Sequence, residues 1–216
     1  YAFGSGTVGT VLGGSAALVK TSEGTVTLNG LNQYTGTTTI EAGKLLLGGS
    51  QVLAAATAVI LNGGTLDLGA GHQNVIAQLE LNQGAILGGT GATLFAGSYL
   101  VRAGDVGVAL AGNAALNKWG AGTVVLSGQN SYTGDTVVNE GRLVLGGNQV
   151  LGASADLVVK AGTLDLGGSF SNAVRSLTLV DGTISRGTIE AGSFTVSNGW
   201  ITAALAGSGS LNLSLI

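Results

Sequence analysis

The chain repeats its own sequence at an interval of 98 residues. Residues 24–69 and residues 122–167 align without a gap, and 25 of their 46 paired positions are identical. The similarity continues on both sides, because residues 8–20 match 106–118 and residues 74–86 match 172–184. A long internal period is typical of repeat architectures, in which similar units stack on one another. We therefore expect one elongated domain over residues 1–216, made of two copies of a unit at about 8–105 and 106–216.

A shorter period lies inside the long one. A glycine followed by alternating apolar residues recurs with spacings of 19, 21 and 20 residues in both copies, at Gly24, Gly43, Gly64 and Gly84 and again at Gly122, Gly141, Gly162 and Gly182. Alternate residues of a strand point to the same face, so Leu66 and Leu68 should be buried together while Asp67 faces outward. No stretch carries a capped helical stripe. The pattern predicts an all-β fold.

A period near 20 residues, with several short strands in each, favours a parallel β-solenoid of about 11 turns, in which each strand stacks on the turn below at roughly 4.8 Å. A leucine-rich repeat needs an asparagine at a fixed place in an LxxLxL pattern, which does not recur here. A sandwich or barrel is the main competitor, since its strands also alternate with glycine-rich turns. Neither of these explains repetition in phase at 19–21 residues.

The composition fits this architecture and excludes several functions. Proline, cysteine and methionine are absent, so disulfides, cysteine-bound zinc and thiol catalysis are excluded. The eight basic residues are scattered among eleven acidic ones, which argues against a nucleic-acid partner. The chain has no apolar run of about 18 residues, so we expect no membrane insertion of this segment. Because it begins in mid-pattern, we expect it to be a segment of a longer chain.

The most regular part of the pattern resembles the autotransporter-associated β-strand repeat of bacterial type V secretion passengers. The family pattern runs approximately Gly-x-Gly-Thr-Leu-x-Leu-x-Gly-x-Asn-x-Tyr-x-Gly-x-Thr-x-Ile-x-x-Gly-x-Leu-x-x-Gly. The first copy carries it in residues 24–48 at Gly24, Leu28, Gly30, Asn32, Tyr34, Gly36, Thr38, Ile40, Gly43, Leu45 and Gly48. The second carries it in residues 120–146 at Gly120, Gly122, Leu126, Gly128, Asn130, Tyr132, Gly134, Thr136, Val138, Gly141, Leu143 and Gly146. One departure is Ser22, where the pattern usually begins with glycine.

This resemblance implies a right-handed parallel β-helix outside the outer membrane. It also implies a C-terminal translocator barrel of the same precursor as a partner, and export through the periplasm and outer membrane to the cell surface or the medium. Adhesion to a host surface, or self-association, is compatible with such a passenger.

Two motifs match the patterns of functional sites but lack the features that such sites require. Residues 4–9 read Gly-Ser-Gly-Thr-Val-Gly, which satisfies a dinucleotide fingerprint, but no helix is expected after it to receive a phosphate. His72 is the only histidine and lies near Asp67, yet no nucleophile elbow accompanies it, and Phe170 stands at the equivalent place in the second copy. We expect His72 to lie on a loop or side surface.

The repeated GTLDLG segments place Asp67 and Asp165 at equivalent positions. Calcium needs six to eight oxygen ligands, and glycosidase carboxyl groups lie about 5–10 Å apart. Five turns of roughly 4.8 Å separate these two aspartates, so they cannot act together. Residues 88–93 also lack the aspartate of a calcium-binding repeat. We expect both carboxylates to face outward and to aid solubility.

Aromatic and amide side chains give the remaining candidates. Tyr34 and Tyr132 could stack on a sugar, but their place inside the repeat favours packing at a corner. Trp119 and Trp200 have no aromatic counterpart 98 residues earlier, which makes them candidates for a contact surface, with packing as the default. A polar row two places before the repeat glycines, containing Asn62 and Asn82, could form an amide ladder between turns.

The sequence therefore predicts a non-enzymatic stalk with no catalytic, cofactor-binding or metal-binding residue and no cofactor. The alternatives are the scaffold of a surface hydrolase, a β-helix polysaccharide lyase, and a trimeric fibre. We also expect the apolar alternation of the last strand, which includes Leu213, to favour end-to-end association through strand edges.

Overall fold

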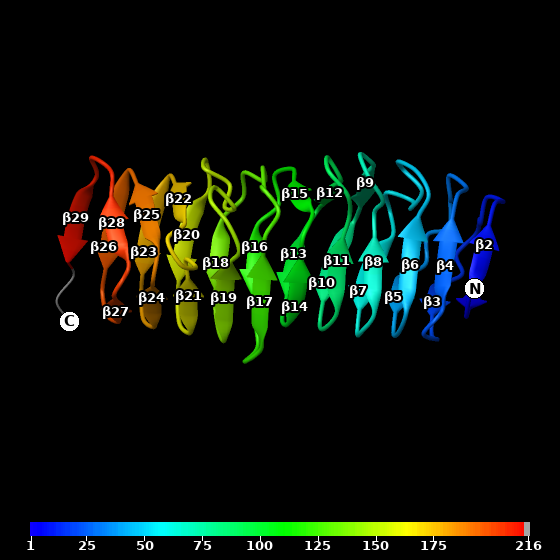
Figure 1. Ribbon diagram of the computed structural model, residues 1–216, viewed down its shortest axis with the longest axis horizontal. Coiled ribbons are helices and arrows are strands. Elements are labelled where there is room, and N and C mark those ends of the chain that lie inside the picture. Colours follow the sequence, from blue (N-terminus) through cyan, green and yellow to red (C-terminus); the bar gives the residue numbers. More distant parts are fainter. Residues whose placement is uncertain (214–216) are drawn as a thin grey trace.

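The computed structural model describes residues 1–213, which form a β-solenoid built from short parallel strands (Figure 1). Each coil contributes one strand to a first sheet and one to a second sheet, and some coils add a third strand. Successive coils follow one another along the long axis from the N-terminal to the C-terminal end (Figure 1). The expected all-β solenoid of about 11 turns is confirmed. None of the described residues forms a helix that could span a membrane.

Sheet A is the first and longer sheet, with twelve strands in parallel. Its strands, in order along the solenoid, are β1 (Ala2–Phe3), β3 (Leu18–Lys20), β5 (Thr38–Ile40), β7 (Ala58–Leu61), β10 (Gln78–Leu81), β13 (Tyr99–Val101), β16 (Leu116–Lys118), β18 (Thr136–Val138), β20 (Asp156–Val159), β23 (Ser176–Leu179), β26 (Ser193–Val196) and β29 (Ser210–Leu213). A shift of 98 residues moves β3 onto β16, which lie five strands apart in this sheet. The long sequence period is therefore five coils.

Sheet B packs against sheet A and has eleven parallel strands. They are β2 (Gly6–Val8), β4 (Thr25–Leu28), β6 (Lys44–Leu47), β8 (Thr65–Asp67), β11 (Ala85–Leu87), β14 (Gly104–Val106), β17 (Thr123–Leu126), β19 (Arg142–Leu145), β21 (Thr163–Asp165), β24 (Thr183–Ser185) and β27 (Trp200–Ile201). A corner of a few residues joins each sheet A strand to the sheet B strand that follows it. We call this edge of the solenoid the A–B corner.

The third side of the solenoid alternates between strands and loops. Two three-stranded sheets lie here. Sheet C contains β9 (Gln73–Ile76), β12 (Thr93–Ala96) and β15 (Ala109–Ala111), and sheet D contains β22 (Ser171–Val174), β25 (Thr188–Ala191) and β28 (Ala204–Ala206). In the coils before sheet C and in those between sheets C and D, the third side is a loop. The loops coincide with the Asn-x-Tyr-x-Gly and Gln-Val-Leu segments of the repeat.

The alternation of apolar residues builds the core. On sheet B, Val26 pairs in register with Leu45, and Leu45 with Leu66, so equal positions of successive coils stack into one column. All three side chains are completely buried, as are Leu68, Leu164 and Leu166. The predicted inward faces of the GTLDLG strands are therefore confirmed. Apolar burial of roughly 25 cal/mol per Å² makes this column the main stabilising element.

A corner glycine shows why the short repeat keeps this residue. Gly64 has a φ of 61°, in the left-handed region that disfavours other residues. A Cβ atom added here would lie 2.6 Å from the carbonyl oxygen of Gly43, the corner glycine one coil earlier. Stacked coils therefore need both the dihedral freedom and the missing side chain at the A–B corner.

Buried asparagines replace strand pairing in the loops of the third side. Asn32 accepts a hydrogen bond from the amide of Leu12 at 2.9 Å and donates one to the carbonyl of Val52 at 2.9 Å. Asn74 then accepts from the amide of Val52 at 2.9 Å. Asn130 and Asn172 repeat these bonds five coils later. Each side-chain amide thus satisfies buried backbone groups at steps between coils where at least one of the two coils has no third strand.

Candidate functional site

Asp67 is held in place by a cation from the preceding coil. Its Oδ2 atom lies 3.0 Å from Nζ of Lys44, and its Oδ1 accepts a hydrogen bond from the amide of Gly69 at 2.9 Å. Burial alone would raise the pKa of this carboxyl, but the Gly69 amide and Lys44 together lower it below the ordinary value. Asp67 therefore remains charged and serves to join two coils.

Asp165 departs from the sequence prediction. Its side chain is completely buried, although it stands on the outward face of β21, because Arg142 and Arg186 cover it from the coils on either side. Nε of Arg186 donates to its Oδ1 at 2.7 Å, and the Nη2 atoms of both arginines bond its Oδ2. The expectation of an exposed, solubilising carboxylate was wrong here, because two cations on adjacent coils converge on it.

The two arginines control the protonation of Asp165. Burial would raise the pKa of this carboxyl, but hydrogen bonds from Arg186, Arg142 and the amide of Gly167 outweigh it and lower the pKa to about 2. A general acid needs the opposite shift, toward neutral pH. Asp67 and Asp165 also stand on β8 and β21, five strands apart in sheet B, which excludes a shared catalytic role. Among residues 1–213, no three His, Cys, Asp or Glu side chains gather as a metal site would require.

Neither His72 nor the glycine-rich segment at residues 4–9 lies beside the groups that a catalytic or nucleotide-binding role would need. His72 lies in the corner between β8 and β9, half-buried, with Nδ1 2.9 Å from the carbonyl oxygen of Leu68. That contact is to the backbone and not to Asp67, so it does not form the base–acid pair of a triad. In the Gly-Ser-Gly-Thr-Val-Gly segment, β2 begins at Gly6 and leads into a turn and then β3. The helix N-terminus that would bind a phosphate is therefore missing from this part of the chain.

The repeated tyrosines are core residues. Tyr34 and Tyr132 are completely buried, and each hydroxyl group bonds a threonine four residues later. The expected packing role at a corner is confirmed, because a buried ring cannot act as a platform for a sugar. Burial, opposed by the bond to Thr136, raises the pKa of Tyr132 to about 12.

The two tryptophans lie on the surface. Trp119 follows β16 at the A–B corner and is 43% exposed, and Trp200 begins β27 with 76% of its surface exposed. Packing was the default expectation for both, and it was wrong. An exposed indole is a common anchor of binding surfaces because it offers a large apolar face together with one hydrogen-bond donor.

A ladder of polar side chains climbs the A–B corner, and it confirms the predicted amide row. Nδ2 of Asn82 donates to Oδ1 of Asn62 at 2.9 Å, and Nδ2 of Asn62 donates to Oε1 of Glu41 at 3.0 Å. Arg102 extends the ladder by donating from Nη1 to Asn82 and to Glu80. Four successive coils are thus joined by side chains as well as by backbone.

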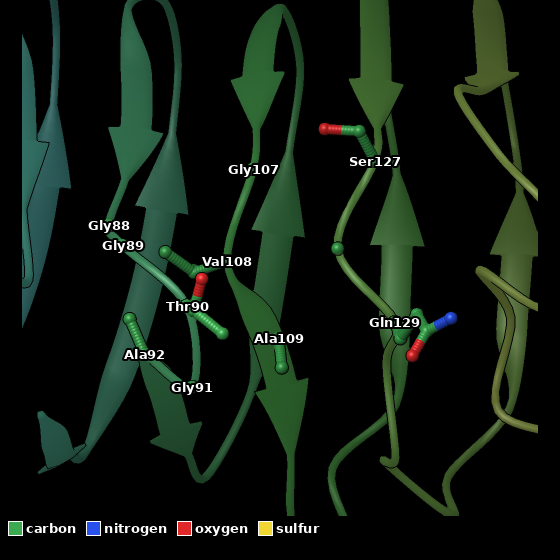
Figure 2. Close-up of a pocket in the computed structure, with 11 residues that line it drawn as sticks. Gly88, Gly89, Thr90, Gly91, Ala92, Gly107, Val108, Ala109, Ser127 and Gln129 are labelled. Carbon is green, nitrogen blue, oxygen red and sulfur yellow. The ribbon is translucent and has the colours of Figure 1, made fainter. Parts of the chain in front are cut away.

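A groove of about 400 Å³ opens where sheet B turns toward the third side (Figure 2). It arises because only Gly107 and Val108 connect β14 to β15, whereas five residues connect β11 to β12 in the preceding coil. Figure 2 shows small side chains on its walls, with Thr90, Ser127 and Gln129 as the polar ones. No lining residue is ionisable, so the groove lacks an acid or base for catalysis.

Two buried lysines were missed from the sequence. Lys20 and Lys118 are fully buried at equivalent places in the two copies. Nζ of Lys118 donates to the carbonyls of Trp119 at 2.9 Å, Gly120 at 2.6 Å and Glu140 at 3.1 Å. Burial lowers the pKa of Lys118, and the nearby charge of Glu140 opposes this. The alternation in the sequence could have predicted this burial, because both lysines stand at inward-facing positions of a sheet A strand.

Comparison with known proteins identifies the repeated coils. Residues 18–47 and 116–145 match the family described as Passenger-associated-transport-repeat. Each match spans two coils, from β3 to β6 and from β16 to β19, including the buried lysine, asparagine and tyrosine of that copy. The chain is also 33% identical over 208 residues to a protein of Brucella suis biovar 1 (strain 1330) named Adhesin BmaC autotransporter. The match covers 83% of this chain but only 6% of that adhesin. No solved structure matches.

Proposed function

We propose that this chain is a repeat-bearing segment of an autotransporter passenger, exported through the periplasm and outer membrane for surface display or secretion, and that it serves as a non-enzymatic stalk. The observation that carries the proposal is the unbroken pairing of sheet A from β1 to β29. A continuous sheet gives a rod whose length grows with the number of coils. Such a rod can hold other parts of a protein away from the cell.

The polar chemistry of the chain supports a structural role. The buried and half-buried charged groups all have partners within the solenoid. Ion pairs with cations of neighbouring coils hold Asp67 and Asp165, and corner carbonyls accept hydrogen bonds from Lys20 and Lys118. An enzyme needs charged groups that converge on open space where a substrate can bind. The groove beside Val108 offers the space but no ionisable wall.

We infer adhesion as a second part of the function. The similar Brucella protein is named an adhesin, and Trp119 and Trp200 are exposed aromatic side chains of the kind found at binding surfaces. A host surface is the partner proposed for this role. Self-association through strand edges is a separate prediction. Sedimentation of the parent chain, compared with Leu213→Lys and Leu213→Pro, tests it.

The precursor is proposed to carry a C-terminal translocator, because the passenger family implies one. We further propose that the chain contains two copies of one structural unit, at about residues 8–105 and 106–216, within a single solenoid. The structural basis is the five-coil offset between equivalent strands, such as β3 and β16.

Deletion of residues 25–122 from the full precursor tests the stalk. It joins Gly24 to Thr123, which follows the glycine equivalent to Gly24 in the second copy, and so removes five complete coils. We expect normal surface display by flow cytometry and resistance to surface protease similar to that of the parent. Deletion of residues 25–112 is the matched control. It joins Gly24 at the A–B corner to Asn113 on the third side, so the strands that follow are out of register with the coil before.

Loss of display or of protease resistance in the in-register deletion, at normal expression, would contradict a modular stalk. The enzymatic alternative is tested on the same surface-displayed protein with polysaccharide, peptide and ester substrates. An activity that disappears in His72→Ala or Asp67→Asn would overturn the non-enzymatic assignment.

A further inference from the structure

The outward face of sheet B carries an unusual set of side chains in its last coils. Arg142 pairs in register with Thr163, Thr163 with Thr183, and Thr183 with Trp200, so these four residues form one row across four strands. The inward neighbours Leu143, Leu164 and Ile184 are completely buried, which fixes the row on the solvent side. Asp165 belongs to the next outward row, with Arg186 just beyond the end of β24.

Charge and hydrogen-bonding capacity remain on this face after its internal pairing. The guanidinium groups of Arg142 and Arg186 share the single carboxylate of Asp165, which leaves one net positive charge. Arg142 uses only Nη2 and Arg186 uses Nε and Nη2 in these bonds. Within residues 1–213, the other N–H groups of both side chains have no protein acceptor. The side chains are 48% and 52% exposed, so a ligand can reach these donors.

The first copy supplies an internal comparison. The corresponding row there is Lys44, Thr65, Ala85 and Asp105, again joined by strand register. Lys44 stands where the second copy has Arg142, and Asp105 stands where it has Trp200. Gly88 occupies the sequence position of Arg186, 98 residues earlier. With Asp67 included, the first face has one positive and two negative charges, so the same scaffold carries opposite net charge in the two copies.

Trp200 adds an apolar platform to the positive face. It lies on β27, next to the strand that leads to Arg186, and is 76% exposed. Three strand spacings separate it from Arg142, which is roughly 14 Å, and three residues along β24 separate its row from Arg186, which is roughly 10 Å. The hydroxyl groups of Thr163 and Thr183 lie between. These are the dimensions of a short oligosaccharide rather than of a single ion.

We propose that this Arg–Trp patch, made of Arg142, Asp165, Arg186 and Trp200 with the threonines between them, binds an acidic glycan that contains uronic acid. A uronate carboxylate accepts hydrogen bonds from the free N–H groups of the two guanidiniums, which match it in planarity and charge. A neighbouring sugar ring lies with its apolar face against the indole of Trp200. Asp165 positions the arginines and does not touch the ligand. The proposal rests on the adhesive role above and names its ligand class.

Calorimetric titration of the purified passenger containing residues 1–216 with tetragalacturonate tests this assignment. We expect saturable binding that weakens as salt is raised, because the contact is between exposed charges. Arg186→Ala should weaken binding about tenfold or more, the loss expected for a charge-assisted hydrogen bond. Trp200→Ala should also weaken it several-fold. Because Trp200 is exposed, this second variant remains folded even if loss of Arg186 disturbs the Asp165 cluster.

Lys44→Ala is the matched control on the first copy, and it should bind as the parent does. Binding of neutral maltotetraose with equal affinity would overturn the proposal, as would affinity for tetragalacturonate that neither Arg186→Ala nor Trp200→Ala changes. Binding of a sulfated heparin oligosaccharide without binding of tetragalacturonate would replace the uronate assignment by a sulfate one. The absence of all glycan binding would remove the patch as a site and leave the stalk function, which the deletion experiment tests separately.

Discussion

The hydroxyl oxygen of Tyr132 lies 2.7 Å from Oγ1 of Thr136, and both side chains are shielded from solvent. The same pair recurs five coils earlier, where the hydroxyl of Tyr34 lies 2.6 Å from Oγ1 of Thr38. In each copy, a loop that leaves sheet B is thereby fastened to the first residue of the next sheet A strand. The repeat motif keeps its tyrosine and threonine four residues apart because they close the coil together.

Replacing Tyr132 by phenylalanine should destabilise the chain by roughly 1–3 kcal/mol, because it leaves the buried Thr136 hydroxyl without a partner. Adding Thr136→Val should restore part of the loss.

The stability of the parent should also fall above pH 10. Tyr132 has a pKa of about 12 in the folded chain and 10.0 in the unfolded chain, so the stabilisation from its protonated hydroxyl declines as the pH rises from 10 toward 12. Urea unfolding at pH 8–12 measures both effects. Additive losses in the double variant would contradict a coupled pair.

Leu166→Ala should cost about 2–5 kcal/mol, because the completely buried side chain would leave a cavity in the core column. Leu31 is 61% exposed on a loop of the third side, so Leu31→Ala is the control and should change stability by less than about 0.5 kcal/mol. Thermal or urea unfolding of the two variants gives the comparison. Equal stabilities would show that the inward and outward faces are assigned incorrectly.

Gly64→Ala should destabilise by about 2 kcal/mol or more, since an alanine at a φ of 61° is strained and its Cβ would meet the carbonyl of Gly43. Gly168 has no positive φ, and a Cβ atom added there would have no other atom within 4 Å. Gly168→Ala should therefore be neutral or slightly stabilising. Calorimetric unfolding separates the two cases, and an unchanged midpoint for Gly64→Ala would argue against the close stacking of corners.

Asp165 should make stability depend on pH in the acid range. Its folded pKa of about 2 lies below the unfolded value of 3.8, so its contribution is present above pH 4 and disappears as pH falls through 2. The size should be about 2 kcal/mol. Asp165→Asn should lose this contribution at neutral pH and show a flatter profile between pH 4 and 2. Parallel profiles for parent and variant would contradict the arginine pairing.

Lys118→Met should destabilise by about 1–3 kcal/mol, because a buried methionine leaves the carbonyls of Trp119, Gly120 and Glu140 without their donor. Lys160 is exposed at the A–B corner two coils later, directly after β20, and Lys160→Met serves as the control. Hydrogen exchange at the corner amides, followed by mass spectrometry, should increase in the first variant only. Unchanged exchange and stability in Lys118→Met would show that the corner does not depend on the ammonium group.

The sequence was sufficient for the parts of the fold that depend on local alternation. Leu66 and Leu68 were assigned to the core because strand parity alone decides which face a residue takes. Gly64 was assigned to a corner because its spacing recurs, and the solenoid followed from the period. Lys118 shows the limit of this reasoning: its parity is inward, but a charged side chain suggests solvent unless corner carbonyls are known to be near.

The candidate surfaces depended on contacts between coils, which a linear pattern does not contain. Asp67 and Asp165 lie in identical GTLDLG segments, yet only Asp165 is sealed from solvent. The difference comes from Arg186, which stands 21 residues later and reaches back one coil. Residue type alone favours packing for Trp200, whereas its place on an outward row of sheet B leaves it exposed.

The pairing of each strand with the strands one coil before and after it has a mechanical consequence. Force applied along the chain at one end would load the ladder of the outermost coil alone, so rupture would proceed by peeling rather than by failure of the whole rod. Each step would free about 20 residues, or roughly 70 Å of contour length. A cell held through such a rod would then experience a series of short yields under tension, and the coils still wound would keep it attached.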